Sequence, residues 1–204
     1  DALLRIPKEM DAVTAAGFTM TYGTSMYGLK QRGCLKSGEK LLVLGAGGGV
    51  GITAVEIGKL MGAQVIAAAS SENKLIAAKR AGADHLINYS EGNIRDKIKN
   101  IVGSNGIDVL YDPVGGELFE PCLRSLAWGG RALVIGFASG MIPKLPTNLT
   151  LVKGCSVVGV FWGAFRTKET EQDNKNFEIL FKWFKEKKLS PLVSQKFSLE
   201  NVKQ

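Results

Sequence analysis

The 204-residue chain has few of the side chains that bind metals or form disulfides: a single histidine, His85, and three cysteines, Cys34, Cys122 and Cys155. The cysteines are isolated and no Cys-x-x-Cys pair occurs, so a zinc site of the usual cysteine and histidine type is not expected. Isolated cysteines in an odd number are typical of reduced thiols. They predict an intracellular protein and favour the cytoplasm over the mitochondrion.

Long apolar runs are also missing. No segment approaches the roughly 20 apolar residues that cross a membrane, and the first residues do not resemble a signal peptide, so no membrane partner is expected. The net charge of +7 is not read as a nucleic-acid site, because many of the lysines lie among acidic residues between positions 166 and 188. That mixture is typical of a solvated helix face. An anionic cofactor accounts for the positive excess equally well.

What the chain has instead is glycine, with 25 residues, five of them between positions 45 and 51. Residues 40–44 have the pattern of a buried strand, and residues 52–61 follow a helical apolar pattern. A strand, a glycine turn and a helix can hold a dinucleotide pyrophosphate, because the backbone approaches the phosphates closely and the helix N-terminus faces the anion. The literal G-x-G-x-x-G is absent, and Ala46-x-Gly48-x-x-Gly51 stands in its place. A glycine turn without a ligand is therefore the alternative.

The next expected strand, residues 64–69, ends at Ser70. About 20 residues past the glycine turn, an NAD site places an acidic residue that accepts the ribose hydroxyls. A carboxylate there would repel the extra phosphate of NADP, whereas the Ser70 hydroxyl leaves room for it. Lys74, one turn into the following helix, adds a compact positive charge. These residues predict NADPH as the cofactor. The alternative makes Ser70 an ordinary helix N-cap and Lys74 a solvated surface residue.

Strands and helices alternate along the middle of the chain. Further strands are expected at residues 84–88, 108–111, 129–136 and 156–160, with helices at residues 72–81, 94–102 and 117–126. This alternation predicts an α/β fold with a doubly wound parallel sheet of the Rossmann type and flanking helices. Ligands are expected at the carboxyl ends of its strands.

The two ends of the chain do not fit this sheet. Residues 12–29 have the pattern of one or two helices, and Phe177, Leu180, Phe181 and Phe184 share one face of an amphipathic helix at residues 177–187. That apolar stripe is expected to be core packing. We therefore expect a helical lead-in segment at residues 1–34, an NADP-binding domain at residues 35–165, and an amphipathic helix with a C-terminal segment at residues 166–204.

Several motifs carry a resemblance to a known family. They are residues 35–43 with the glycine turn, residues 81–85, 87–89, 111–116 (Tyr-Asp-Pro-Val-Gly-Gly), 123–131 and 136–140. Together they resemble the medium-chain dehydrogenase/reductase superfamily, and within it the zinc-free quinone oxidoreductase branch, the zeta-crystallin-like proteins. The resemblance spans essentially the entire chain.

The resemblance implies specific site residues. In that family, the positions of Gly48, Gly49, Val50 and Gly51 bind pyrophosphate, those of Ser70, Lys74 and Tyr89 form the 2′-phosphate pocket, and those of Thr24, Gly136, Phe137 and Phe161 lie along the nicotinamide. No protein group does covalent chemistry there, and no catalytic or metal-binding residue is implied. Hydride passes directly from NADPH to a small electrophilic acceptor, such as a quinone or an enone. The resemblance thus implies an NADPH-dependent oxidoreductase. Two alternatives stay open, an enoyl reductase acting on an activated C=C bond and an NADPH-binding module without turnover.

The chain also departs from the family pattern. Relatives begin with a GroES-like domain, which nothing here resembles, and they continue with a further helix and strand where this chain stops. We expect a cofactor-domain fragment that binds nucleotide but does not turn over substrate alone. Relatives also pair through the edge strand of the sheet, which residues 155–161 resemble, so a homodimer is expected. An interior strand at that position is the alternative.

Overall fold

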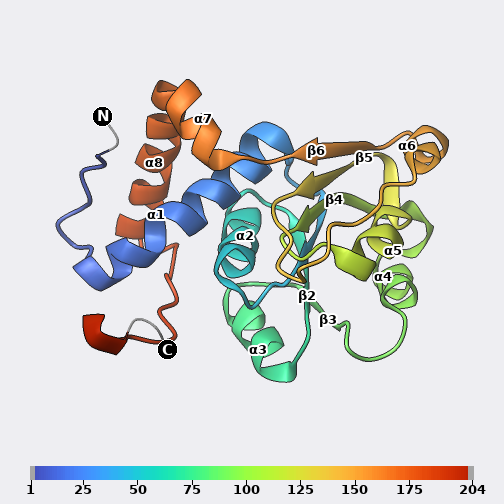
Figure 1. The fold of residues 1–204 in the computed structure, drawn as a ribbon, viewed down its shortest axis with the longest axis horizontal. Coiled ribbons are helices and arrows are strands. Elements are labelled where there is room, and N and C mark those ends of the chain that lie inside the picture. Colours follow the sequence, from blue (N-terminus) through green and yellow to red (C-terminus); the bar gives the residue numbers. More distant parts are fainter. Residues whose placement is uncertain (1–2, 202–204) are drawn as a thin grey trace.

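The structure is a computed structural model that describes residues 3–201. The remaining residues of the expected lead-in and C-terminal segments, 1–2 and 202–204, lie outside the described part of the chain. Within it, six strands form one parallel sheet in the order β3-β2-β1-β4-β5-β6 (Figure 1). They are β1 (Lys40–Leu44), β2 (Gln64–Ala69), β3 (His85–Asn88), β4 (Ile107–Asp112), β5 (Leu126–Val134) and β6 (Ser156–Gly159). The strand order reverses between β1 and β4, which confirms the expected doubly wound fold.

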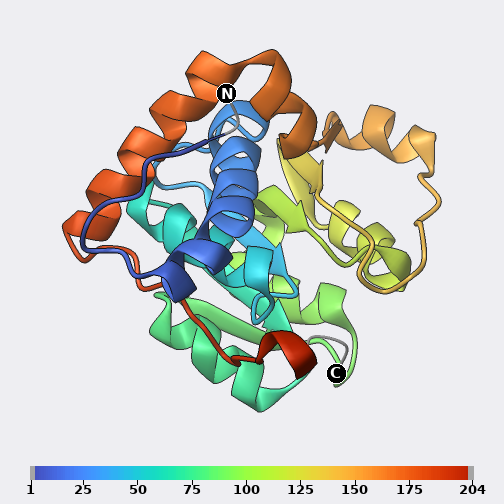
Figure 2. The same cartoon turned by 60° about the vertical axis from the view of Figure 1, so that its left-hand side comes forward.

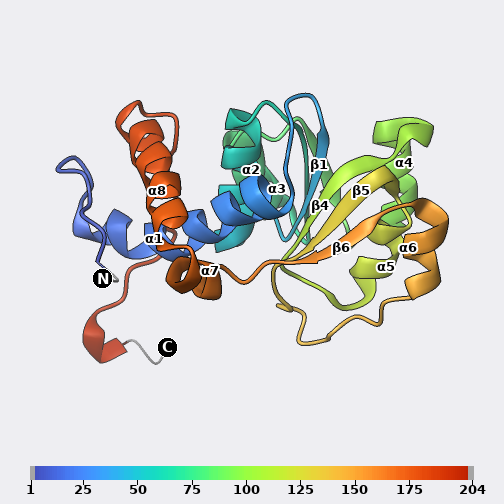
Figure 3. The same ribbon diagram turned by 90° about the horizontal axis from the view of Figure 1, so that it is seen from above.

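The central strands are mostly apolar because both faces of the sheet are covered. One face carries α2 (Gly49–Leu60) and α3 (Glu72–Arg80), and the other carries α4 (Ile94–Val102), α5 (Phe119–Leu123) and α6 (Thr147–Lys153), as Figure 3 shows. Each face has its own hydrophobic cluster. Leu41 points into the first cluster and Leu42 into the second, and neither side chain is exposed to solvent.

The helices at the two ends of the chain pack on each other and on α2. The N-terminal helix α1 (Ala12–Met26) continues into a π-helical turn (Tyr27–Arg32), and the C-terminal half contains α7 (Trp162–Lys168) and α8 (Thr170–Lys185). Helix α8 lies beside α1 (Figure 2), and the Phe181 ring of its apolar stripe stacks on Phe18 with centroids 5.7 Å apart. Phe177 and Leu180 are buried. The stripe is therefore core packing, as the sequence predicted.

Some local expectations were wrong. The helix expected at residues 117–126 is a 3₁₀ turn followed by α5, which ends at Leu123. Leu126 instead begins β5 and pairs with Ile107, three residues before the expected start of that strand. The strand accommodates its two glycines through a shift in register and a positive φ of 73° at Gly129. The short helices α6 and α7 were not expected. β6 does lie at the edge of the sheet, as the sequence predicted, and the alternative of an interior strand was wrong.

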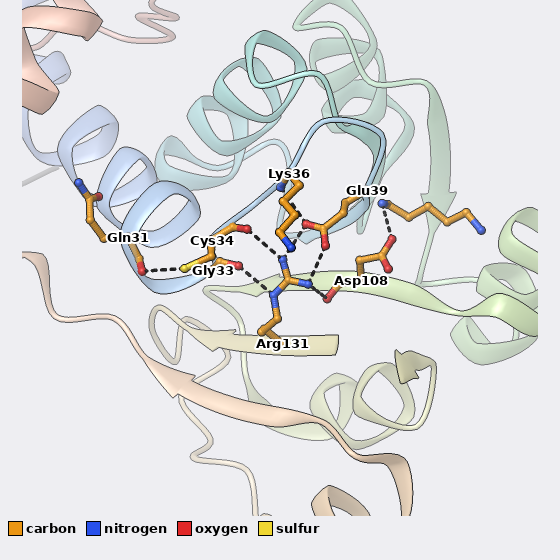
Figure 4. A network of polar contacts seen from close by, with 8 residues as sticks. Gln31, Gly33, Cys34, Lys36, Glu39, Asp108 and Arg131 are labelled. Atoms are coloured by element: carbon orange, nitrogen blue, oxygen red, sulfur yellow. Dashed lines mark hydrogen bonds and ion pairs between the residues drawn. The ribbon is translucent and has the colours of Figure 1, made fainter. Parts of the chain in front are cut away.

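Arg131 on β5 holds the connection between the lead-in helices and β1 (Figure 4). Its guanidinium donates to both carboxylate oxygens of Glu39, at 2.9 and 2.7 Å, and to the carbonyl oxygens of Gly33 and Cys34, at 2.8 and 3.4 Å. Burial of Glu39 would raise its pKa, but the hydrogen bonds from Arg131 and from the Lys36 backbone N–H outweigh it, and the pKa is lowered. This clamp lies at the amino ends of the strands, opposite the glycine turn.

Candidate functional site

The glycine turn leads directly from β1 into α2. The helix begins at Gly49, and Gly48 is its N-cap residue, which has no side chain to satisfy the N–H groups of the first turn. The first turn also contains no acidic residue, and both glycines are exposed. The open N-terminus of this 12-residue helix can therefore receive an anion through its N–H groups and its dipole.

The glycines of the turn serve different purposes. A Cβ on Gly51 would lie 2.1 Å from the Gly45 carbonyl oxygen, so Gly51 allows the close contact of helix and strand. A Cβ on Gly47 would lie 2.6 Å from the Cβ of Lys74, so Gly47 makes room for α3. On Gly49, the nearest atom to such a Cβ is a methyl carbon of Thr21, 3.2 Å away. Gly49 is exposed and its added Cβ would meet only this one side-chain atom, whereas the other two positions are filled by the protein.

The structure brings the three expected 2′-phosphate residues to neighbouring strand ends. Lys74 Nζ donates to Ser70 Oγ at 3.1 Å, beside the glycine turn. The backbone N–H of Tyr89, directly after β3, donates to the Ala69 carbonyl oxygen at the end of β2. The N-cap of α3 is Ser71 rather than Ser70, so the reading of Ser70 as a helix cap was wrong. The Ser70 hydroxyl and the Lys74 ammonium together make a small polar site that fits a phosphate.

The loops after β4 and β5 are joined by hydrogen bonds. The Asp112 carboxylate is buried and accepts from the N–H groups of Val114 and Gly115, both at 2.8 Å. Burial raises its pKa, and these two hydrogen bonds oppose that rise. The backbone N–H of Gly136 donates to the Asp112 carbonyl oxygen at 3.4 Å. The Phe137 ring packs against Gly115, where an added Cβ would lie 3.1 Å from it. Gly136 and Phe137, the expected nicotinamide residues of the loop after β5, are thus both fixed to the loop after β4.

Phe137 and Phe161 both line an open pocket of about 550 Å³ at the ends of β5 and β6. Thr24 is partly buried on α1 and does not line that pocket. Its helix nevertheless lies alongside, because a Cβ on the neighbouring Gly23 would be 2.7 Å from the ring of Trp162, the residue after Phe161. The structure therefore collects the expected residues into two groups, one at the ends of β1 to β3 and one at the ends of β4 to β6.

The sequence analysis missed several residues around these groups. Thr21 faces Gly49 from α1, and Lys97 Nζ donates to the Asn88 carbonyl oxygen at 2.8 Å, next to Tyr89. Neither residue belongs to a recognised motif: Thr21 reaches the site from α1, distant in sequence, and Lys97 reaches it from α4, the helix that follows β3. Across residues 3–201, no group of three or more His, Cys, Asp or Glu side chains is placed to hold a metal ion. No helix in the same range is long and apolar enough to span a membrane.

Comparison with known proteins identifies the class. A family model described as "Zinc-binding dehydrogenase" matches residues 49–178. The chain belongs to this family, in the medium-chain dehydrogenase/reductase superfamily, and the predicted resemblance to quinone oxidoreductase-like proteins is confirmed. It is 37% identical to the quinone oxidoreductase-like protein 2 homolog of Nematostella vectensis over 203 residues, which are 98% of this chain and 55% of that protein.

Solved structures agree with this assignment. The quinone oxidoreductase of Escherichia coli, complexed with NADPH, has a TM-score of 0.84 and 26% identity, over 94% of this chain and 59% of that one. The CurK enoyl reductase has a TM-score of 0.84 and 25% identity, over 95% of this chain and 57% of that one. The chain spans a little over half the length of these curated relatives.

Proposed function

We propose that this chain is the cofactor-binding part, over about residues 35–165, of an NADPH-dependent oxidoreductase that reduces a quinone or a similar electrophilic acceptor. The observation that carries the proposal is the Ser70–Lys74 hydrogen bond beside the open N-terminus of α2. The exposed first turn of α2 supports a pyrophosphate site, and the adjacent hydroxyl and ammonium groups support a 2′-phosphate site next to it. The NADPH complex of the E. coli relative supports the same cofactor.

The chain's own residues would bind and orient the cofactor. The first turn of α2 would donate N–H groups to the pyrophosphate, and Ser70 and Lys74 would contact the 2′-phosphate. Phe137 and Phe161 would line the nicotinamide. When bound, NADPH would supply a hydride, which carries both electrons and one hydrogen, and one further proton taken up from solvent would complete the hydroquinone. The protein supplies position rather than a covalent intermediate.

Cofactor selectivity tests the proposal. By calorimetry, NADPH should bind at least about 10-fold tighter than NADH, a difference of ~1.4 kcal/mol. Lys74→Ala should weaken NADPH binding and leave NADH binding little changed, and Ser70→Asp should remove the preference by repelling the phosphate. Lys79→Ala is the matched control, since Lys79 lies at the far end of α3 and contacts the Ala83 carbonyl oxygen. Equal affinities for NADPH and NADH in the unmodified protein would contradict the proposal.

The similarity to the CurK enoyl reductase favours a second candidate, reduction of an activated C=C bond. The chemistry at the nicotinamide is the same for both, so the acceptor decides between them. NADPH oxidation by the full-length protein should be measured with a quinone series and with an enone series. Turnover of enones alone would favour the enoyl reductase. Tight NADPH binding without turnover of either series would favour a binding module.

We further propose that the chain forms a homodimer through β6. The strand lies at the edge of the sheet, and α6 leads directly into it. Beside it, Trp128 is 83% exposed, Leu151 is 82% exposed and Val152 is 72% exposed, and the Trp128 ring lies over Gly154 in the link to β6. A free strand edge bordered by exposed apolar side chains is suited to pairing with a second copy across a two-fold axis.

Sedimentation velocity tests this assembly. Leu151→Glu should convert a dimer to a monomer without unfolding it, because the side chain is exposed in the single chain. Val158 on β6 packs partly against the core, so its replacement by lysine would also disturb the fold. Met20→Glu is the control, an exposed apolar residue on α1 away from β6. An unmodified protein that sediments as a monomer at tens of micromolar would contradict the proposal.

A further inference from the structure

Three buried hydroxyl groups meet where α1, α2 and β4 come together. Ser25 on α1 and Tyr111 on β4 are fully buried, and Thr53 on α2 is 3% exposed. Ser25 Oγ lies 2.8 Å from Thr53 Oγ1 and 2.9 Å from the Tyr111 hydroxyl oxygen. The surrounding side chains are those of the hydrophobic cluster on this face of the sheet. Hydroxyls in such surroundings are costly unless each finds a partner.

The available acceptors give the hydrogen bonds a direction. Within the described part of the chain, Ser25 is the hydrogen-bond partner of the Tyr111 hydroxyl, which stays protonated because burial raises its pKa. Tyr111 therefore donates to Ser25 Oγ, and Ser25 donates to the Val50 carbonyl oxygen at 3.0 Å or to Thr53. Thr53 in turn has carbonyl acceptors on both helices, Thr21 at 3.2 Å and Gly49 at 3.3 Å. Every hydroxyl proton has an acceptor, and this series of hydrogen bonds ends at the first turn of α2.

Each element joined by these hydroxyls continues into the candidate site. Ser25 directly follows Thr24, and Thr21 of the same helix faces Gly49. Thr53 lies one turn after the exposed start of α2. Tyr111 directly precedes the Asp112 loop, which packs on Gly45 through Val114. Apolar packing alone tolerates small slides between helices, whereas directional hydrogen bonds in a low-dielectric core fix one arrangement.

We propose that Ser25, Thr53 and Tyr111 are positioning residues that set α1 against the glycine turn and so determine how the nicotinamide half of NADPH lies beside Thr24. The inference rests on the proposed function, because it presumes that NADPH occupies this site. On this proposal, how tightly the nicotinamide half is bound depends on residues that do not line the pocket at Phe137 and Phe161.

The test compares two ligands, NADPH and 2′,5′-ADP, which lacks the nicotinamide half. By calorimetry, Tyr111→Phe and Thr53→Val should each weaken NADPH binding by about fivefold, the effect of one hydrogen bond, and change 2′,5′-ADP binding by less than about twofold. Thr53→Ser keeps the hydroxyl and should restore the affinity ratio of the unmodified protein. If Tyr111→Phe does not fold, the two Thr53 variants provide the same comparison.

Tyr22→Phe is the matched control. Tyr22 is also buried on α1, but its hydroxyl donates to Glu56 in the middle of α2, away from the glycine turn. This variant should lose stability and keep the ratio of the two affinities. Equal weakening of both ligands in folded Tyr111→Phe or Thr53→Val, or an unchanged ratio, would overturn the inference and leave the proposed function standing. An unmodified protein that binds neither NADPH nor 2′,5′-ADP would overturn both the inference and the proposed function.

Discussion

Gly49→Asp separates the stability of the glycine turn from its capacity to bind an anion. Gly49 is not among the glycines with positive φ, and an added Cβ would meet only the Thr21 methyl carbon, at 3.2 Å, which must move by a few tenths of an ångström. An acidic residue in the first turn of α2 interacts favourably with the helix dipole, by about 0.3–1 kcal/mol. Replacing a helical glycine adds about 0.5–1 kcal/mol by restricting the unfolded chain. The free energy of unfolding should therefore stay the same or rise slightly.

Binding should respond in the opposite direction. The carboxylate would occupy the place of the pyrophosphate, and two like charges about 4 Å apart repel by about 4 kcal/mol at an effective dielectric constant near 20. We expect NADPH affinity to fall by at least about 100-fold, or ~2.7 kcal/mol. Gly49→Asn has nearly the same shape without the charge, so it measures the steric part of the loss. Its affinity should lie between those of the unmodified protein and Gly49→Asp.

Unfolding with and without NADPH gives both quantities in one assay. At 100 times its dissociation constant, NADPH should stabilise the unmodified protein by about 2.7 kcal/mol. For a chain of this size, that corresponds to a rise in Tm of about 5–11 °C. At the same NADPH concentration, Gly49→Asp should be stabilised by at most about 0.4 kcal/mol, a rise in Tm of no more than about 1–2 °C. Gly51→Ala is the contrasting control, since its Cβ would collide with the Gly45 carbonyl oxygen and destabilise the fold itself. A folded Gly49→Asp variant with unchanged NADPH binding would refute the assignment of the glycine turn as the pyrophosphate site.

Two further predictions concern the clamp and metal content. Arg131→Met should lower the free energy of unfolding by about 1–3 kcal/mol at neutral pH, because it leaves the half-buried Glu39 carboxylate without its charged donor. The lowered pKa of Glu39 stabilises the fold above the pKa of about 4.3 of an unfolded glutamate, and this contribution is lost as pH falls through the folded pKa. In urea unfolding, the free energy of unfolding should fall less between neutral and acidic pH for Arg131→Met than for the unmodified protein. An equal fall in the two proteins would contradict this account. Elemental analysis should find no stoichiometric zinc, and chelators should leave unfolding unchanged, whereas one tightly bound zinc per chain would contradict the prediction.

The fold followed from the sequence where a local pattern determined the structure. β1 and β2 are short apolar runs between glycine or polar turns, and they form the buried centre of the sheet. The sequence was a poor guide where tertiary pairing decided the outcome. Leu126 belongs to a strand because Ile107 pairs with it. The seven-residue helices α6 and α7 are too short to show an apolar period.

The candidate site divides in the same way. The proposed phosphate end consists of backbone groups and of Ser70 and Lys74, only four residues apart, so a short stretch of sequence contains its signal. The proposed nicotinamide end depends on contacts between distant elements. Ser25 and Tyr111 are 86 residues apart, and nothing in the sequence near either residue indicates that their hydroxyls meet. Buried hydrogen bonds of this kind depend on the packing of three elements, because a hydroxyl becomes a positioning group only when the backbone places an acceptor within about 3 Å of it. Variants of the phosphate end should therefore change which cofactor binds, whereas variants of the hydroxyl group should change how its nicotinamide half is held.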